Sequence, residues 1–293
     1  RVLFRSKEMN TSLTVISMEP HPRMFFNSGQ KEFRLNSLQT KSDLLKKFGV
    51  DYFIVLPFDK TLATMEAEDF VLDILIRKIE ALHVVVGYDY CFGAGRRGGI
   101  NVLGWLSKEE QFGLTIVEKV MEDDHIYSSS NIRATLEAGD VRKVADRLGH
   151  WWHVEGQVCQ GDQRGRTIGF PTANILLAGY KEPKYGVYAV RMIIECGPGK
   201  GTWEAIANVG RRPTFNKKDV LLEIYIFNFN FDIYGQSVKV EFVDFIRPEY
   251  KFDGLESLKK QIKKDCLVAK KILSKTENQQ SFIPSPQLAD HIS

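Results

Sequence analysis

Short apolar runs alternate with helical stretches in the first half of the chain. The runs at 12–18, 51–58 and 83–90 are rich in β-branched and aromatic residues and have the length of strands. Between them, 68–82 and 107–113 have the apolar spacing of helices. This order, with mostly apolar strands, predicts a parallel sheet covered on both faces. Such a sheet binds ligands beyond the carboxyl ends of its strands.

In the second half, strand follows strand with turn residues between them. The apolar runs of this half lie at 152–161, 186–195, 203–210, 220–229 and 237–246. Short strands without intervening helices predict an antiparallel barrel or sandwich. Segment 255–275 has helical spacing and predicts a closing helix, and the polar, proline-broken segment 276–293 predicts a disordered tail. The residues expected to form one apolar face of that helix are Leu255, Leu258, Ile262, Leu267 and Ile272.

Composition limits the class of protein. A chain of 293 residues with 43% hydrophobic content can form two ordinary domains, each with its own core. Its 40 Lys and Arg are spread along the chain against 37 Asp and Glu, so neither a nucleic-acid partner nor a membrane partner is expected. The modest basic bias suits phosphorylated ligands. The four cysteines are far apart, which predicts reduced thiols in the cytoplasm and no zinc site.

The densest turn is the stretch GDQRGRTIGFPTAN. Gly161, Gly165 and Gly169 allow the backbone to approach a ligand and to aim its N–H groups at phosphate oxygens. No Walker A motif occurs in the chain. Thr172 and Asn174 alternate after the proline, so both side chains point to one side and offer oxygen ligands to Mg²⁺. The alternative is a turn that only connects two strands.

A carboxylate lies inside the apolar run at 220–229. Glu223 shares one strand face with aromatic residues, and the opposite face is aliphatic, so both faces are expected to be buried. Desolvation would raise its pKa and prepare it to act as a general base on a hydroxyl. The alternative is a glutamate at a wet barrel rim. The turn at 207–215 has two arginines and is either a phosphate clamp or a hairpin connection.

Three polar segments of the first half follow strands or open helices. His21 lies between two prolines where the first strand ends, and 87–99 combines glycines with Arg97. The serines at 128–130 begin a helix that carries Arg133 in its first turn. The serines are either helix caps or, with the arginine and the free N–H groups, part of an anion site.

These motifs, in this order, resemble those of the bacterial bifunctional riboflavin kinase and FMN adenylyltransferase, or FAD synthetase, family. GRTIGFPTAN, YGVYAV, ANVGRRPTF and LEIYIFNFNFDIYG resemble the kinase module, whereas EPHPRMFF, GYDYCFGAGRRGG and SSSNIRATLEAGDV resemble the adenylyltransferase module. The resemblance implies a Rossmann-like nucleotidyltransferase domain at 1–145. It also implies a six-stranded antiparallel riboflavin kinase barrel with a C-terminal helix at 146–275.

The resemblance implies two reactions. ATP phosphorylates the ribityl 5′-hydroxyl of riboflavin to give FMN, and a second ATP adenylylates FMN to FAD with release of pyrophosphate. It implies that Thr172 and Asn174 bind Mg-ATP and that Glu223 is the catalytic base. The residues it suggests for flavin binding or for a flap are Arg212, Phe215 and Tyr234. The residues it suggests for the adenylyltransferase site are His21, Asp89, Arg97, Ser129, Ser130 and Arg133.

The chain departs from the family pattern at its start. Family members begin with a strand and a Gly-x-Phe-Asp-Gly-Val-His-x-Gly-His segment that holds ATP phosphates, and this sequence enters near Glu-Pro-His-Pro. An N-terminally truncated first domain is therefore expected, with riboflavin kinase activity alone if residue 1 is a true end and both activities if the chain is a fragment. Ser130 and Asn131 replace a Thr and an Arg of the family motif.

A non-catalytic regulator that binds flavin or nucleotide is the alternative class. The combination of Thr172, Asn174 and Glu223 argues against it, because a sensor needs neither a general base nor metal ligands. A monomer or weak self-association is expected.

Overall fold

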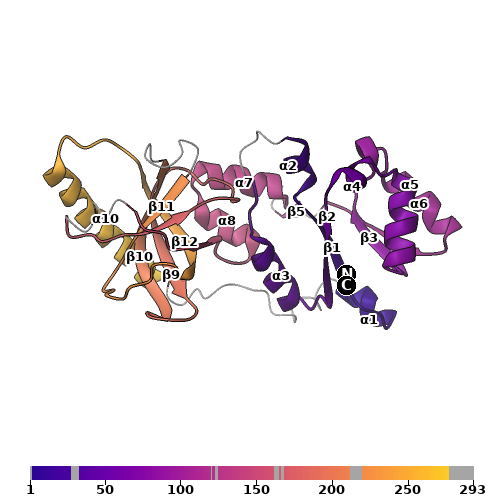
Figure 1. Cartoon of the computed structure of the whole chain (residues 1–293), viewed down its shortest axis with the longest axis horizontal. Coiled ribbons are helices and arrows are strands. Elements are labelled where there is room, and N and C mark those ends of the chain that lie inside the picture. The colour runs from indigo at the N-terminus through magenta and orange to yellow at the C-terminus, as the bar shows by residue number, and fades with distance from the viewer. Residues whose placement is uncertain are drawn as a thin grey trace. The chain divides into compact units, whose positions relative to one another are not determined.

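The computed structural model forms two compact units (Figure 1). The residues that it describes are 2–27, 33–119, 121–122, 125–161, 165, 168–211 and 220–276. The first unit comprises Arg1–Gln30 with Ser42–Tyr127, and the second comprises Lys31–Lys41 with Ser128–Ser293. The predicted tail lies outside the described residues beyond Thr276. The functional boundary expected at 145/146 stays a prediction, although the compact units divide at 127/128.

The first unit contains parallel strand pairs. Its four longer strands are β1 (Thr14–Glu19), β2 (Tyr52–Pro57), β3 (His83–Gly87) and β4 (Gly113–Val117). β1 pairs with β2 and β3 with β4, both in parallel, which confirms the strand type predicted from the apolar runs. Among the described residues these are two separate pairs rather than one continuous sheet. The short strands β5 (Met121–Glu122) and β6 (His125–Ile126) pair antiparallel.

Helices alternate with these strands along the chain. The helices of the first half are α1 (Val2–Glu8), α2 (Pro22–Phe26), α3 (Leu38–Lys47), α4 (Lys60–Thr64), α5 (Ala67–Asp69), η1 (Phe70–Lys78), η2 (Ala94–Arg96) and α6 (Ile100–Glu109). The expected helix at 68–82 corresponds to α5 and the π-helical η1, which buries Val71 in the same core cluster as Leu103 of α6. The helix expected at 107–113 is wrong in extent, because α6 begins at Ile100 and Gln111 is left-handed (φ 55°).

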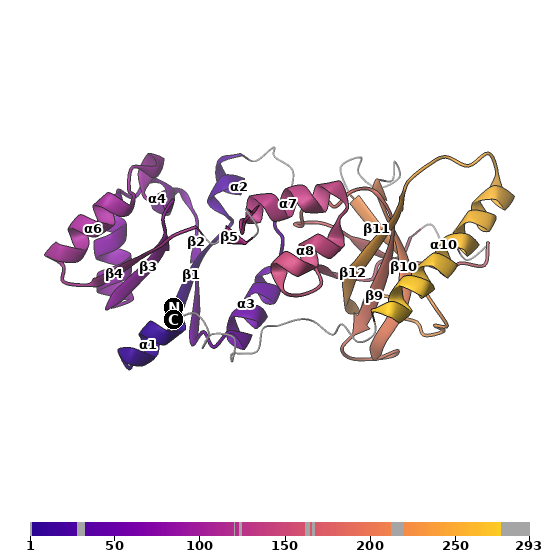
Figure 2. The same cartoon turned by 180° about the vertical axis from the view of Figure 1, so that it is seen from behind.

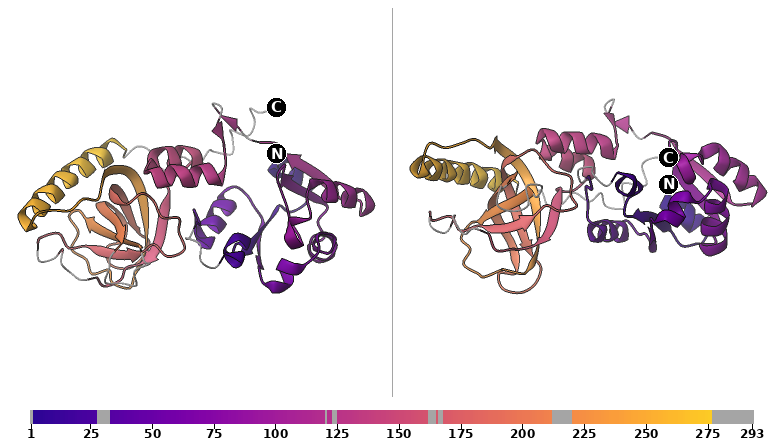
Figure 3. Two further views of the ribbon diagram at one scale, coloured as in Figure 1. Left: turned by 90° about the horizontal axis from the view of Figure 1, so that it is seen from above. Right: turned by 45° about the horizontal axis from the view of Figure 1, so that its top comes forward.

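The second unit is a six-stranded antiparallel barrel in the strand order β7-β12-β9-β10-β11-β8. Its strands are β7 (His153–Gln157), β8 (Ala173–Leu176), β9 (Gly186–Ile194), β10 (Gly201–Arg211), β11 (Val220–Ile226) and β12 (Ser237–Pro248). The barrel is nearly closed because Gly156 of β7 lies against β8, where a Cβ would be 2.4 Å from Ile175. Figure 3 shows the strands curling around a common interior. The barrel predicted from the second half is therefore confirmed.

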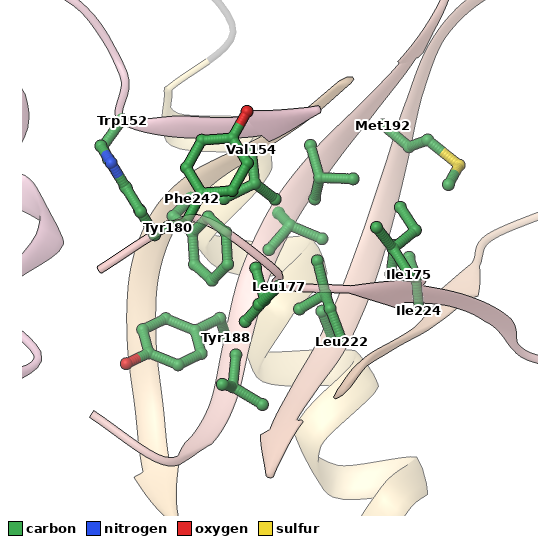
Figure 4. Close-up of a cluster of buried hydrophobic side chains, with 14 of the residues drawn as sticks. Trp152, Val154, Ile175, Leu177, Tyr180, Tyr188, Met192, Leu222, Ile224 and Phe242 are labelled. Atoms are coloured by element: carbon green, nitrogen blue, oxygen red, sulfur yellow. The ribbon is translucent and has the colours of Figure 1, made fainter. Parts of the chain in front are cut away.

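Alternate residues of the strands fill the barrel. Figure 4 shows Leu222 and Ile224 of β11 packed with Ile175 of β8, and all three are fully buried. Trp152 and Phe242 close one end of this core with ring centroids 4.8 Å apart. Because side chains alternate along a strand, the residues between these core positions point to the outside of the barrel.

Helices α7 (Ser129–Ala138), α8 (Val141–Leu148) and α10 (Leu255–Lys275) belong to the second unit. The predicted closing helix matches α10, which lies on the outside of the barrel (Figure 2). The predicted apolar face is wrong at Leu255 and Leu267, which are 53% and 70% exposed. Leu258, Ile262 and Ile272 are half-buried, and Ile272 packs against the core. Ala269 and Leu273, which the prediction left out, are fully buried. In the described part of the chain, no helix has the length and apolar character needed to cross a membrane.

Candidate functional site

Three polar side chains form a row across neighbouring strands on the outer face of the barrel. Glu223 of β11 pairs with Asn174 of β8 on one side and with Asn208 of β10 on the other. Opposite residues of an antiparallel pair have Cβ atoms about 4.5–5.5 Å apart. The neighbours of these residues along each strand point into the core. The pairing thus brings two predicted site residues, Asn174 and Glu223, together.

The row continues to a second carboxylate. Asn208 Nδ2 donates a hydrogen bond to Glu249 Oε1 at 2.8 Å. The Glu249 carboxylate in turn covers Gly210, where a Cβ would lie 2.3 Å from Oε1. Sequence reasoning missed Asn208 and Glu249. The only local signal was the polar residue between the core positions Ala207 and Val209, which alternation places on the outer face.

The glycine turn packs closely against this row. A Cβ on Gly161 would lie 2.3 Å from Asn174 Nδ2, and one on Gly165 would lie 2.2 Å from the Phe170 carbonyl oxygen. Gly169 has φ +88°, a left-handed conformation that favours glycine. Two of the three glycines therefore make room for the chain's own groups. The turn residues 162–164, 166 and 167 lie outside the described residues.

Asn174 is held in place by its backbone. It is 4% exposed, and its carbonyl oxygen accepts the Cys159 N–H at 2.8 Å and the Cys159 thiol at 3.2 Å. Burial raises the pKa of the Cys159 thiol, which keeps this sulfur protonated as a donor. Thr172 is half-buried just before β8. Its hydroxyl lies close to Gly165, where a Cβ atom would be 3.5 Å from Thr172 Oγ1. A hydroxyl and an amide are thus available at the start of one strand.

Glu223 is half-buried, and its Oε1 atom is shielded from solvent. Its strand neighbours Leu221 and Ile224 are 3% and 0% exposed, so both faces of β11 are covered as expected. Two residues further on, the Tyr225 ring meets the Phe170 ring edge to face with centroids 5.2 Å apart. The Glu223 carboxylate is thus part of the polar row that crosses the strands, and the Phe170 and Tyr225 rings lie beside it along β11.

Of the three predicted flavin or flap residues, the structure describes one. Tyr234 lies in the turn before β12, is 42% exposed, and its N–H donates to Asp232 Oδ1 at 3.1 Å. Arg212 and Phe215 lie outside the described residues.

In the first unit, the predicted residues follow strand ends. His21 follows β1 and is the N-cap of α2, where its Nδ1 accepts the Arg23 N–H at 3.1 Å. Asp89 follows β3, and its carboxylate lies close to Gly87: a Cβ atom at that glycine would be 3.3 Å from Asp89 Oδ1. The Arg97 side chain is exposed, and its Nη1 atom lies 3.9 Å from Glu66 Oε2. These contacts are local, and they leave the proposed catalytic roles as predictions.

The predicted anion site at 128–130 opens α7 in the second unit. Ser128 is the N-cap and accepts the Asn131 N–H at 3.2 Å, and Ser129 and Ser130 are exposed in the first turn. Arg133 Nε donates to the Phe33 carbonyl oxygen at 2.7 Å, and its guanidinium lies 4.8 Å from the Phe33 ring. A capping role for the first serine is thus visible in the structure.

A barrel with a carboxylate opposite an asparagine, beside a glycine-rich turn, together with a unit of parallel strand pairs, fits the class of two-domain enzymes that bind nucleotides. Comparison with known proteins gives the family. Residues 148–273 match the riboflavin kinase family model, and residues 1–131 match the FAD synthetase family model.

Whole-chain relatives agree with both matches. The bifunctional riboflavin kinase/FMN adenylyltransferase of Haemophilus influenzae is 37% identical over 266 residues, which cover 91% of this chain and 85% of the relative. The Escherichia coli K12 protein of the same name is 34% identical over 271 residues, covering 92% and 86%. The chain belongs to this bifunctional riboflavin kinase/FMN adenylyltransferase family.

A solved structure of a Streptococcus pneumoniae protein, named a macrolide-efflux protein, shares the fold. The two structures align with a TM-score of 0.77 at 29% identity, over 92% of this chain and 86% of the Streptococcus chain. The name macrolide-efflux protein applies to the Streptococcus protein alone.

Proposed function

We propose that this chain acts in FAD biosynthesis and that its barrel transfers the γ-phosphoryl group of ATP to the ribityl 5′-hydroxyl of riboflavin. The observation that carries the kinase assignment is the placement of Glu223 directly opposite Asn174. A desolvated carboxylate beside a phosphate-binding turn suits a base that acts on an attacking hydroxyl. The family match at 148–273 supports the same assignment.

In this reaction Glu223 accepts the proton of the 5′-hydroxyl as the oxygen attacks the γ-phosphorus in line, and ADP leaves. Asn208, whose Nδ2 is held by Glu249, keeps its Oδ1 as an acceptor for a hydroxyl of the polyol chain. The backbone N–H groups of the glycine turn hold the phosphates. Catalysis then rests on positioning, because phosphoryl transfer asks little covalent chemistry of the protein.

The donor set at the start of β8 fits Mg²⁺. Thr172 supplies a hydroxyl oxygen and Asn174 an amide oxygen, and both are hard ligands. Magnesium usually takes one or two protein ligands and completes its shell with substrate phosphates and water. Among the described residues, no group of three or more His, Cys, Asp and Glu is arranged to hold a metal ion. When bound, the ion neutralises the β- and γ-phosphates.

The adenylyltransferase domain expected at 1–145 is proposed to catalyse the second reaction, in which FMN attacks the α-phosphorus of ATP to give FAD and pyrophosphate. The match of 1–131 to the FAD synthetase model supports it. The proposed residues are His21, Asp89, Arg97, Ser129, Ser130 and Arg133. Incubating the chain with riboflavin, ATP and Mg²⁺ and separating the flavins by chromatography tests both reactions. FMN alone would limit the chain to the kinase step, and FAD would establish both.

The kinase assignment is tested by Glu223→Gln. We expect kcat for FMN formation to fall by about 10²–10⁴-fold, because the proton loses its acceptor, while riboflavin binding is retained. Glu195→Gln, which changes an exposed glutamate at the end of β9, is the matched control. Riboflavin binding without turnover in the unaltered chain would instead support the alternative of a flavin-binding regulator.

Soluble flavins and nucleotides are the proposed partners, without nucleic acid or membrane, in the cytoplasm. The near balance of 40 basic and 37 acidic residues supports this. A monomer or weak self-association is tested by sedimentation at several concentrations.

A further inference from the structure

The Glu249 carboxylate reaches the polar row from a strand that is not its neighbour. Glu249 follows β12, which pairs with β9, and β9 in turn pairs with β10, the strand that carries Asn208. The Glu249 carboxylate nevertheless accepts a hydrogen bond from Asn208 Nδ2 at 2.8 Å. The chain after β12 therefore crosses over the end of β9 to reach β10.

Gly186 provides the room for this crossing. It is the first residue of β9, and it pairs with Pro248 of β12 on one side and with Val209 of β10 on the other. A Cβ atom at Gly186 would lie 2.3 Å from the Arg247 carbonyl oxygen and 3.0 Å from Pro248 Cα. Because the glycine has no side chain, the end of β12 approaches β9 closely and directs Glu249 toward β10.

The residues near Glu249 in the sequence are anchored. Arg247 donates two hydrogen bonds to the buried Asp265 carboxylate, at 2.9 and 2.7 Å. The Arg247 guanidinium lies 4.4 Å from the Tyr250 ring centroid, so the residue that follows Glu249 is also held. An exposed side chain must give up rotamer freedom to keep one position, and a fixed backbone limits that cost. Glu249 is exposed, yet its backbone is held from both sides.

The carboxylate decides which way the Asn208 amide faces. An ionised carboxylate only accepts hydrogen bonds, so the NH₂ group of Asn208 faces Glu249 and its Oδ1 faces away. Gly210 lets the carboxylate lie there, since a Cβ atom at that glycine would be 2.3 Å from Glu249 Oε1 and 3.1 Å from Oε2. Strand pairing places Asn208 opposite Glu223. An acceptor oxygen is thus kept beside the proposed base.

We propose that Glu249 is a positioning residue for phosphoryl transfer, which holds the Asn208 amide so that its Oδ1 accepts a hydroxyl of the polyol beside Glu223. The proposal rests on the proposed kinase function. A polyol carries hydroxyl groups on successive carbons, so Asn208 can accept from one hydroxyl while Glu223 takes the proton of the attacking one. Glu249 contacts neither hydroxyl and acts through Asn208.

Two substitutions disturb the Glu249 carboxylate in different ways. Glu249→Ala removes it, and Gly210→Ala displaces it, because the new methyl group would meet the end of this flexible side chain. We expect each to lower kcat/KM for riboflavin by about 10–100-fold and to change KM for ATP by less than about twofold. Gly210→Ala in the Glu249→Ala chain should cause no further loss, because nothing is left to displace. Glu195→Ala, at an exposed position at the end of β9, is the control and should change neither value.

Glu249→Gln tests the orientation of the amide. Glutamine can accept from the Asn208 NH₂ group, but its own NH₂ group can also donate to a reversed amide, so we expect a loss of kcat/KM smaller than that of Glu249→Ala. A loss of stability in urea with unchanged kcat/KM would give Glu249 a structural role and overturn the proposal. An equal rise in KM for ATP, or a full further loss in the double variant, would also overturn it.

The side-chain NH₂ group of Asn208 reports its position without turnover. Its pair of NMR signals is assigned by its absence in Asn208→Ser, and it should shift in Glu249→Ala and Gly210→Ala but not in Glu195→Ala. If the unaltered chain forms no FMN, the kinase function fails, and these signals still decide whether Glu249 positions Asn208. Signals that do not shift in Glu249→Ala contradict the proposal, even in a chain that forms FMN.

Discussion

At Asn174 the backbone and the side chain have different tasks. The carbonyl oxygen accepts two hydrogen bonds from Cys159, which ties the start of β8 to the segment between β7 and the glycine turn. The side chain is left on the outer face, opposite Glu223. Its position is set by Gly161, whose missing side chain provides the room.

Gly161→Ala tests this arrangement. The new Cβ would lie 2.3 Å from Asn174 Nδ2, so the amide must move away from its place in the polar row. We expect KM for ATP to rise at least 10-fold and the free energy of unfolding to fall by about 1–3 kcal/mol. Gly104→Ala is the control, because nothing lies within 4 Å of that position in α6 and helix propensity alone should stabilise it by up to about 1 kcal/mol. An unchanged KM for ATP would contradict the assigned role.

At the scale of elements, an ion pair anchors the buried face of α10 to the barrel. Arg247 of β12 donates from Nε and Nη2 to Asp265 Oδ2 at 2.9 and 2.7 Å, and Gln261 donates to Oδ1 at 2.8 Å. Asp265 is 3% exposed, and burying it brings Ala269 and Leu273, one and two turns later, against the barrel.

Removing one partner of this pair should be costly. Asp265→Ala leaves the Arg247 guanidinium, 16% exposed, without its carboxylate. We expect the free energy of unfolding in urea to fall by about 3–5 kcal/mol, and the double variant Arg247→Met with Asp265→Leu to recover much of that loss. Asp244→Ala breaks the more exposed pair with Arg142 and should cost about 1 kcal/mol or less. Equal losses in both single variants would show that burial is irrelevant here.

The thiol beside Asp265 makes the stability of the barrel depend on pH. Burial, with the Asp265 charge as a second cause, raises the pKa of Cys266 from 9.0 to about 11. The folded state thus favours the neutral thiol, and this contribution is complete below pH 9 and is lost as pH rises toward 11.

We expect the unaltered chain to lose about 1 kcal/mol more than Cys266→Ala between pH 8.5 and pH 11, after allowance for the partly exposed thiol. Urea unfolding across that range measures the difference. Cys196→Ala, which removes an exposed thiol, is the control and should follow the unaltered chain. Parallel curves for Cys266→Ala and the unaltered chain would refute the prediction.

At the scale of the whole molecule, a segment of the first half completes the barrel unit. Trp152 Nε1 donates to the Leu35 carbonyl oxygen at 2.8 Å, and Ser37 donates to Glu155 at 2.7 Å. Thr40 Oγ1 lies 3.2 Å from His153 Nε2, with both residues buried. Residues 31–41 therefore group with 128–293, although more than eighty residues separate them in the sequence.

Thr40→Val tests the strength of this attachment in the full chain. Valine keeps the volume of threonine and removes the hydroxyl that meets both Ser37 and His153. We expect the free energy of unfolding of the second unit to fall by about 1–3 kcal/mol. Thr64→Val, at an exposed position in α4 where the hydroxyl bonds only its own helix, should cost much less. A loss as large in the control would argue against a specific attachment.

The sequence by itself determined the features that depend on local periodicity. Alternation along 220–226 placed Glu223 on the face opposite Leu222 and Ile224, because successive side chains of any strand point to opposite sides. The same argument placed Thr172 and Asn174 on one side, and family motifs added the expected chemistry. These inferences needed no knowledge of which strand lies beside which.

Only the tertiary structure decided the register and the partners. The pairing that puts Asn174 and Asn208 beside Glu223 depends on hydrogen bonds between strands far apart in the chain. The buried face of α10 was misjudged because Asp265 is buried by a partner on β12, which hydrophobic spacing cannot reveal. Glu249 and the segment at 31–41 were missed for the same reason: long-range contacts, unlike periodicity, leave no regular spacing in the sequence.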